Sequence, residues 1–532
     1  MTIKSQPRLR VPGLFYFYFM KKLIILLAFC PIFAIAQKYD YHWVYNYPFF
    51  SDSSLHFDFN TSTPTIATEN VTLPFNTFDV TMSNYDGNLL FYSNGFKVMN
   101  ASNEMMQNGD SLNWNDIAEY FSDIGTGYPS LYMISLPAPG SDSLYYLLSV
   151  RFIEQDTATG YFYPSRDLLY SLVDVSASNG MGKVLEKNQQ IGTGIFSADF
   201  PNACKHANGR DWWYIAGEDT ASIYYRTLLT PTGFSGLEVQ NIGYQPPFPQ
   251  ANGLGDGGGQ NLFTPDGTKF VDFDPWNGIN IFDFDRCTGQ LSNPLLISFP
   301  EKLNFGTGAA ISPNSRFLYV DGDTLIYQFD LWASDIAASV DTVAIWDGFY
   351  TPGTLNPVAF GRMQLMPDGK IYVLVGSTSP YIHYIANPNV KGDACNVVQH
   401  EMELPDILFG IPTFPNYRLY DLPGSPCDTL GIDGPPTAAT EAVLELPEGD
   451  IVLSPNPAST SLHINSVNCP WQPREVAIYD AMGREVLRRA HPATVRSYTL
   501  ALPELADGVY FVKINSKNGK SFTRMIVVNK AY

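Results

Sequence analysis

Residues 264–273, Thr264-Pro265-Asp266-Gly267-Thr268-Lys269-Phe270-Val271-Asp272-Phe273, are the clearest copy of a turn-and-strand unit that predicts the fold. Its first four residues predict a tight turn, because proline presets φ, aspartate caps the backbone and glycine accepts a positive φ. The aromatic and β-branched residues that follow predict a strand. Two further copies of the sharp turn begin at Ser312 and Met366, and each is also followed by an apolar run.

Looser forms of this turn-and-strand unit recur through residues 39–422, with no lasting helical period between them. A repeat of about 50 residues that contains several strands predicts a β-propeller. Six turns predict six blades, and residues 39–76 closing against 405–422 would make a seventh, which we favour. The rival architecture is a pair of β-sandwiches, which would not need the repeat. The six turns are Asp86-Gly87, Ser141-Asp142, Asn208-Gly209, Asp266-Gly267, Asn314-Ser315 and Asp368-Gly369.

The composition agrees with an exported all-β protein. The chain has 532 residues with 42 Gly, 39 Pro, 14% aromatic residues and only 16% charged residues. Many turn formers and aromatics with few charges are typical of strands joined by short turns. The formal net charge of −20 repels phosphate backbones and therefore argues against a nucleic-acid partner.

The last 82 residues follow a different pattern. Short alternating strands in residues 451–532 predict a small antiparallel β-sandwich. Residues 423–450 carry prolines and glycines that interrupt any regular element, and we interpret them as a linker. The predicted domains are therefore a propeller over 37–422, the linker, and the sandwich over 451–532.

The N-terminus has the organisation of a secretory signal peptide. Met20-Lys21-Lys22 precedes the apolar residues 23–33, and Ala34-Ile35-Ala36 supplies a small-residue cleavage site before Gln37. The apolar stretch is too short for a permanent membrane span, which needs about 20 residues. We therefore interpret residues 1–36 as a signal peptide cut between Ala36 and Gln37, with translation starting at Met20. The expected route is the Sec pathway into the periplasm.

Five cysteines would remain after that cleavage, an odd number for a protein exported to an oxidising compartment. Because Cys395 and Cys427 flank the end of the large domain, we expect them to pair. At least one of the five would stay free or bond to another chain. The five are Cys204, Cys287, Cys395, Cys427 and Cys469.

Catalytic and metal-binding signatures are absent from the sequence. It contains no G-x-S-x-G nucleophile elbow, no H-E-x-x-H zinc motif and no C-x-x-C pair. We therefore assign no catalytic residue, no metal site and no cofactor. The candidate ligand-binding residues are His206, Arg210, Asp211 and Trp212, which could line the mouth of a propeller. The alternative for these four residues is a packed blade turn with a structural Arg–Asp pair.

The C-terminal module resembles the sorting domain of the type IX (Por) secretion system along nearly its whole length. The motifs that match, in order, are Ser454-Pro455-Asn456-Pro457, Ile478-Tyr479-Asp480-Ala481-Met482-Gly483, Gly508-Val509-Tyr510 and Lys530. The resemblance implies recognition of residues 451–532 by the outer-membrane translocon. It also implies release of the cargo or its attachment to surface lipopolysaccharide.

The repeats of the large domain resemble the YVTN/WD-like propellers of exported type IX proteins. The segments that carry this resemblance are residues 86–95, 205–213, 285–289 and 425–431. The resemblance implies a fold and an export route, and no activity, because propellers support many unrelated functions.

The function expected from these observations is that of a secreted or cell-surface binding module whose ligand, a glycan or a protein, is not specified by the sequence. One alternative is a polysaccharide hydrolase or lyase on a propeller scaffold. Another is a structural surface or adhesion component. The absence of catalytic motifs favours a protein that is not an enzyme.

Overall fold

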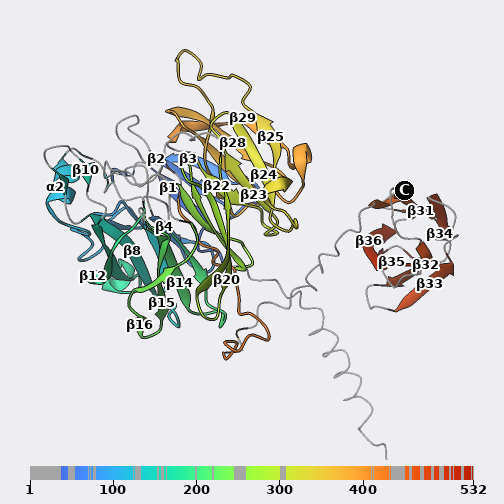
Figure 1. Cartoon of the computed structure of the whole chain (residues 1–532), viewed down its shortest axis with the longest axis horizontal. Coiled ribbons are helices and arrows are strands. Elements are labelled where there is room, and N and C mark those ends of the chain that lie inside the picture. Colours follow the sequence, from blue (N-terminus) through green and yellow to red (C-terminus); the bar gives the residue numbers. More distant parts are fainter. Residues whose placement is uncertain are drawn as a thin grey trace, which may run out of the picture. The chain divides into compact units, whose positions relative to one another are not determined.

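The chain forms two compact units, Met1–Pro435 and Pro436–Tyr532, and the boundary between them falls inside the predicted linker (Figure 1). Each unit is described by itself. The computed structural model describes residues 37–45, 54–69, 71, 73–75, 80–123, 125, 127, 133–152, 155–156, 161–162, 165–197, 201–218, 221–244, 259–299, 307–408, 410, 412–430, 432, 450–454, 458–467, 473–480, 484–490, 497–502, 505–506, 508–516, 521–528 and 530.

The described part of unit 1 is a series of antiparallel sheets in chain order (Figure 1). The first three sheets contain three, three and four strands. Sheet 1 consists of β1 (His42–Tyr45), β2 (Ser54–Asp58) and β3 (Thr65–Glu69); sheet 2 of β4 (Val80–Ser83), β5 (Leu89–Ser93) and β6 (Val98–Asn100); sheet 3 of β7 (Ile134–Pro137), β8 (Leu144–Phe152), β11 (Ser165–Asp174) and β12 (Lys183–Ile195).

Four more sheets follow in the same way. Sheet 4 consists of β13 (Asn202–Lys205), β14 (Trp212–Gly217), β15 (Ile223–Thr230), β16 (Gly233–Phe234) and β17 (Glu238–Asn241); sheet 5 of β18 (Gln260–Phe263), β19 (Lys269–Asp274), β20 (Gly278–Asp285) and β21 (Gln290–Ile297); sheet 6 of β22 (Ala309–Ile311), β23 (Phe317–Asp321), β24 (Leu325–Asp330) and β25 (Asp341–Ile345); sheet 7 of β26 (Phe360–Leu365), β27 (Ile371–Val375), β28 (Ser379–Ile385) and β29 (Val397–Leu408).

Smaller elements decorate these sheets. The helix α2 (Asp116–Asp123) lies between sheets 2 and 3, where the sequence predicted no helix. A two-stranded ribbon joins β9 (Gln155–Asp156) to β10 (Tyr161–Phe162). Short 3-10 turns occupy Ser178–Gly180, Ala337–Ser339 and Gly392–Cys395.

The sheets are arranged as a ring. The first strands lie beside one another, with β1 next to β4, β4 next to β7, β13 next to β18, β18 next to β22, and β22 next to β26. The last strand of sheet 7, β29, contacts β2 and β3 of sheet 1, so the series returns to its start. The propeller fold is therefore confirmed. The described residues contain seven consecutive sheets, and the number of blades stays a prediction.

All six predicted turns join the first and second strands of a sheet, in sheets 2 to 7. In each, a side-chain oxygen caps the next strand, as Asp266 does when its Oδ1 accepts a hydrogen bond from the Thr268 N–H at 3.0 Å. Gly267 has a φ of +71°, the conformation for which glycine was predicted there. The strands predicted after the turns are also confirmed.

One glutamine joins three of the first strands. Gln260 on β18 is buried, and its Oε1 accepts hydrogen bonds from Ala309 N on β22 at 3.0 Å and from Met363 N on β26 at 3.4 Å. Its Nε2 donates to the Met363 carbonyl at 3.1 Å. Gly308 leaves room for this amide, because a Cβ at that position would lie 2.2 Å from Gln260 Oε1.

The chain after sheet 7 crosses back over earlier sheets, and we call residues 412–430 the closing segment. The buried Tyr417 donates its hydroxyl to the Ser135 carbonyl of β7 at 2.8 Å, and its ring lies 5.9 Å from that of Trp212. Arg418 forms a two-pronged ion pair with Asp40, at 2.5 and 2.9 Å. The predicted closure by residues 405–422 therefore takes the form of side-chain packing, and no strand is assigned to the closing segment.

The disulfide differs from the predicted one. Cys427 bonds to Cys287 in the turn between β20 and β21, with their Cα atoms 5.6 Å apart. The predicted partner, Cys395, is a free and fully buried residue in the core of sheets 6 and 7. The prediction was wrong because it used proximity along the chain, whereas the closing segment carries Cys427 to sheet 5. Cys204 is also free and buried, and Cys469 lies outside the described residues.

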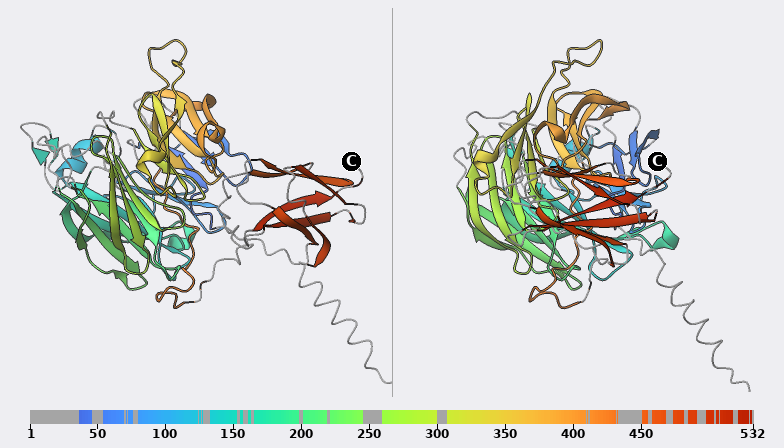
Figure 2. Two further views of the ribbon diagram at one scale, coloured as in Figure 1. Left: turned by 45° about the vertical axis from the view of Figure 1, so that its right-hand side comes forward. Right: turned by 90° about the vertical axis from the view of Figure 1, so that its right-hand side faces the viewer.

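Unit 2 is the predicted β-sandwich (Figure 2). One sheet has the order β30 (Asp450–Ser454), β31 (Ser461–Val467), β34 (Ser497–Ala501), and the other has the order β33 (Glu485–Ala490), β32 (Pro473–Asp480), β35 (Gly508–Ser516), β36 (Ser521–Val528). Alternate residues such as Leu462, Ile464, Val512 and Ile514 are fully buried between them. The predicted turns at 481–483 and 518–519 lie outside the described residues.

A buried histidine gives unit 1 a predictable response to acid. His383 on β28 is completely buried, and its Nδ1 accepts a hydrogen bond from the His400 N–H at 3.0 Å. Burial, with a smaller contribution from His400, lowers the pKa of His383 from 6.5 to about 4. A proton on Nδ1 would also face the His400 N–H, so the folded protein holds this ring neutral.

We expect unit 1 to lose stability as the pH falls from about 6.5 toward 4, because the unfolded chain then binds a proton at His383 that the folded chain does not. From this histidine, urea unfolding of the full chain at pH 7.5 and pH 5 should show a loss of about 2 kcal/mol. His383→Asn keeps an acceptor for the His400 N–H and should remove that part of the loss. His463→Asn, at an exposed site in unit 2, should leave it in place. An equal pH dependence in wild type and His383→Asn would contradict the assignment.

Candidate functional site

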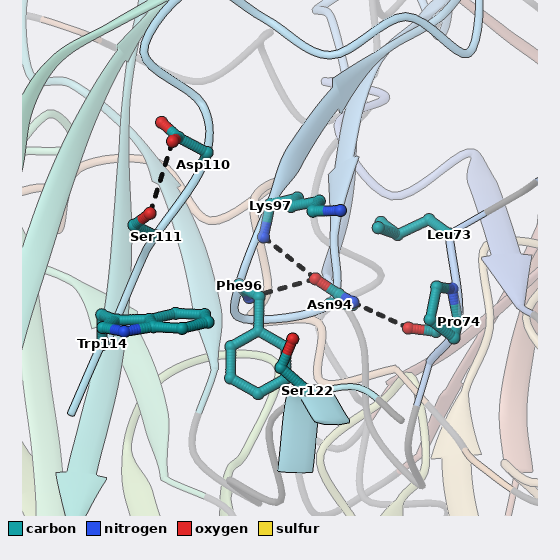
Figure 3. Close-up of a pocket in the computed structure, with 9 residues that line it drawn as sticks. All are labelled: Leu73, Pro74, Asn94, Phe96, Lys97, Asp110, Ser111, Trp114 and Ser122. Carbon is teal, nitrogen blue, oxygen red and sulfur yellow. Dashed lines mark hydrogen bonds between the residues drawn. The ribbon is translucent and has the colours of Figure 1, made fainter. Parts of the chain in front are cut away.

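A pocket of about 380 Å³ lies beside sheet 2, and we call it the Trp114 pocket (Figure 3). Its walls come from the segment before β4, the turn between β5 and β6, the segment after β6, and helix α2. The lining residues are Leu73, Pro74, Asn94, Phe96, Lys97, Asp110, Ser111, Trp114 and Ser122.

The Asn94 side chain stabilises one wall of the pocket through three hydrogen bonds. Its Nδ2 donates to the Pro74 carbonyl at 2.7 Å, and its Oδ1 accepts hydrogen bonds from the N–H groups of Phe96 and Lys97, each at 3.0 Å. Gly95 adopts a φ of +85°, which lets the chain turn tightly between the two strands. The buried amide therefore presets the positions of Phe96 and Lys97, as Figure 3 shows.

The opposite wall presents an aromatic ring to the pocket. Trp114 is 42% exposed, and its ring lies 6.1 Å from that of Phe96 in an edge-to-face arrangement. The preceding residue, Asn113, is buried and anchored, because it receives hydrogen bonds from Ser149 Oγ at 2.7 Å and donates its N–H to Asn188 at 2.8 Å. The backbone that carries Trp114 is thus fixed to sheet 3.

The pocket also contains a carboxylate that remains ionised. Lys187 on β12 donates to the Asp110 carbonyl at 2.7 Å and to its Oδ1 at 3.2 Å. The hydrogen bond from Lys187 is the main reason that the pKa of Asp110 lies below its ordinary value. Ser111 Oγ lies 3.3 Å from the other carboxylate oxygen. Asp110 therefore offers an acceptor beside the hydroxyl of Ser111, whereas Ser122 lies next to Phe96 in Figure 3.

This combination suits a small polar ligand with an apolar face. An exposed aromatic ring can cover the C–H face of a sugar, while carboxylate and hydroxyl groups bond its hydroxyls. Asp110 is the one carboxylate among the described lining residues, whereas glycoside hydrolysis needs two. Within the described part of the chain, no group of His, Cys, Asp or Glu side chains is placed to hold a metal ion.

The four ligand-binding residues predicted from the sequence lie elsewhere: His206, Arg210 and Asp211 are in the turn between β13 and β14, and Trp212 begins β14. His206 Nε2 lies 3.0 Å from the Cys287 carbonyl, and Arg210 Nε donates to Asp211 Oδ1 at 2.7 Å. Trp212 is buried, with Tyr417 on its edge and the Lys205 ammonium 5.0 Å from its ring centre. The structure thus brings the four together in a packed turn, and a binding role for them remains a prediction.

The predicted signal cleavage site is only partly described. Ala36 lies outside the described residues, and Gln37 accepts a hydrogen bond from Lys205 Nζ at 3.2 Å. Among the described residues, no helix is long and apolar enough to span a membrane.

Sequence reasoning missed the Trp114 pocket. The segment 86–95 carries only the resemblance to a repeat, and none of the residues predicted to bind a ligand lies near Trp114. The lining residues come from four separate segments, and the partner of Asp110 is 77 residues away. An isolated tryptophan next to polar residues was the available signal, and it does not distinguish a pocket from a core.

Comparison with known proteins identifies the C-terminal unit. The chain combines a propeller with a C-terminal β-sandwich, and residues 453–529 match the family described as "Secretion system C-terminal sorting domain". Unit 2 therefore contains a type IX (Por) sorting domain, which implies engagement with the type IX secretion machinery and export to the cell surface or beyond. A comparison with curated proteins finds no match.

Solved structures similar to this chain include several propellers and lactonase-like proteins. The Dos1 propeller is 13% identical, with 71% of this chain and 88% of that chain covered and a TM-score of 0.39. A putative 6-phosphogluconolactonase of Bacteroides uniformis is 12% identical over 87% of this chain and all of that chain, at a TM-score of 0.35. A periplasmic gluconolactonase of Pseudomonas aeruginosa is 13% identical over 76% and 87%, at 0.34. None of the three gives this chain an activity.

Proposed function

We propose that this protein is a saccharide-binding module that the type IX system delivers to the outer surface or the medium. The observation that carries the proposal is the exposed ring of Trp114 at the wall of a preformed pocket. Asp110, Ser111 and Ser122 add polar groups to the lining of the same pocket. The proposed ligand is a glycan, because an aromatic face next to hydroxyl and carboxylate groups matches the two kinds of surface on a sugar ring.

The proposed route begins with a Sec signal peptide that ends at Ala36, and it continues through the periplasm to the outer-membrane translocon. Attachment to surface lipopolysaccharide after export belongs to the same proposal. The support comes from the sequence pattern of residues 20–37 and from the sorting domain at 453–529.

Trp114→Ala should weaken glycan binding by about 30-fold, because a central aromatic contact is worth about 2 kcal/mol. The full mature chain would first be tested on a glycan array, and the affinity for each hit would be measured by calorimetry. Trp332→Ala is the matched control, since Trp332 is 43% exposed on sheet 6 and does not line the pocket. Equal affinities for wild type and Trp114→Ala would place the binding elsewhere and contradict the proposal.

A further inference from the structure

The charges of the Trp114 pocket do not balance. Asp110 is neutralised by its ion pair with Lys187 at 3.2 Å. Lys97, on the opposite wall, is an exposed residue whose ammonium has no hydrogen-bond or ion-pair partner among the described residues. The described lining therefore leaves one uncompensated positive charge inside a pocket of a chain whose formal net charge is −20.

Lys97 is also the strongest free donor of the pocket. The N–H groups of Phe96 and Lys97 are already bonded to Asn94 Oδ1, and the Asn94 amide N–H is bonded to the Pro74 carbonyl. The hydroxyls of Ser111 and Ser122 are neutral and can donate or accept. An ammonium forms charge-assisted hydrogen bonds, which are roughly twice as strong as those between neutral groups, and a carboxylate also compensates its charge, which a neutral hydroxyl does not.

Figure 3 shows how the two walls divide these roles. The Lys97 side chain extends toward Leu73 and away from Trp114, and the Phe96 ring lies between them. A saccharide with one ring against Trp114 would therefore reach Lys97 through a second ring. The field of a strongly acidic chain repels polyanions at long range, which favours a ligand with a single carboxylate over a highly charged polymer.

We propose that the ligand of the Trp114 pocket is a saccharide with one carboxylate, such as a terminal uronic acid, and that this carboxylate pairs with Lys97. This inference rests on the proposed glycan-binding function and names the chemical class of its ligand.

The test uses the full mature chain and two matched probes, a glucuronyl-glucose disaccharide and its carboxyl methyl ester, with affinities measured by ligand-observed NMR titration. The acid should bind up to about fivefold more tightly than the ester, since an ion pair with an exposed lysine contributes at most about 1 kcal/mol. Lys97→Met should remove this preference without changing the affinity for the ester. Lys97→Arg should retain it, and Lys391→Met, at an exposed lysine of sheet 7, should have no effect.

The outcomes separate the two proposals. If the acid and the ester bind equally, or if Lys97→Met weakens both alike, the carboxylate inference is wrong, and sensitivity to Trp114→Ala would still support glycan binding. If no glycan binds in a Trp114-dependent way, both proposals fail. Lys97-dependent binding of a peptide carboxylate without any glycan binding would also overturn the saccharide assignment.

Discussion

A chain that lacks residues 451–532 should fold its propeller and remain in the periplasm. The match to the sorting domain covers residues 453–529, and the core of unit 2 is formed by its own strands. Its removal should therefore take away the export signal and leave every residue of the main core of unit 1 in the chain. Cell fractionation should show the full chain at the surface or in the medium and the shortened chain inside the outer membrane.

Two controls make this result specific to the sorting domain. N-terminal sequencing of the exported full chain should begin at Gln37, which would establish the first step of the route. A chimaera whose residues 451–532 are replaced by an unrelated β-sandwich should stay in the periplasm, because it lacks the sorting domain that implies engagement with the type IX machinery. Surface appearance of either the shortened chain or the chimaera would show that the export signal lies elsewhere.

Cys427→Ser should lower the free energy of unfolding of unit 1 by about 3–5 kcal/mol. The bond to Cys287 spans 140 residues, and a link across a loop of that length strongly restricts the unfolded chain. It also ties the closing segment to sheet 5, next to the contact of Arg286 with the Tyr420 carbonyl. Denaturant unfolding of the full chain under oxidising conditions measures the loss.

Either cysteine of the disulfide can be replaced, so two single variants and a double variant test the same bond. Cys287→Ser, Cys427→Ser and the double variant should lose the same stability, because each removes the same constraint. A reducing agent should destabilise wild type by a similar amount and leave the three variants unchanged. Additive losses in the double variant would mean that the thiols contribute through packing and not through the disulfide.

The sequence predicted the framework of this fold because the framework depends on local interactions. In the turn at 264–267, Asp266 Oδ1 accepts a hydrogen bond from the N–H group two residues later. Gly267 adopts a positive φ, which glycine allows without a steric clash. Alternation along strands such as residues 509–514 likewise places residues on one face or the other by position alone. Both kinds of pattern are visible in the chain, so the propeller and the sandwich could be predicted.

The sequence did not predict contacts between residues that are distant along the chain. The ion pair of Arg418 with Asp40 spans 378 residues, the disulfide spans 140, and the bond from Lys187 to Asp110 spans 77. Each forms because ring closure brings separate sheets together, and no local pattern encodes which sheets become neighbours. For the same reason the sequence predicted a site at the His206 turn, whose residues are close along the chain, and not at the Trp114 pocket, whose lining comes from four segments.

Local patterns in the sequence therefore specify the strands, the turns between them and the sorting domain. The assembled sheets specify which cysteines pair, how the closing segment crosses the ring, and where Trp114 shares a pocket with Lys97, whose ammonium has no partner among the described residues. The physical reason is that backbone conformation follows from neighbouring residues, whereas a binding site requires several sheets to be held together.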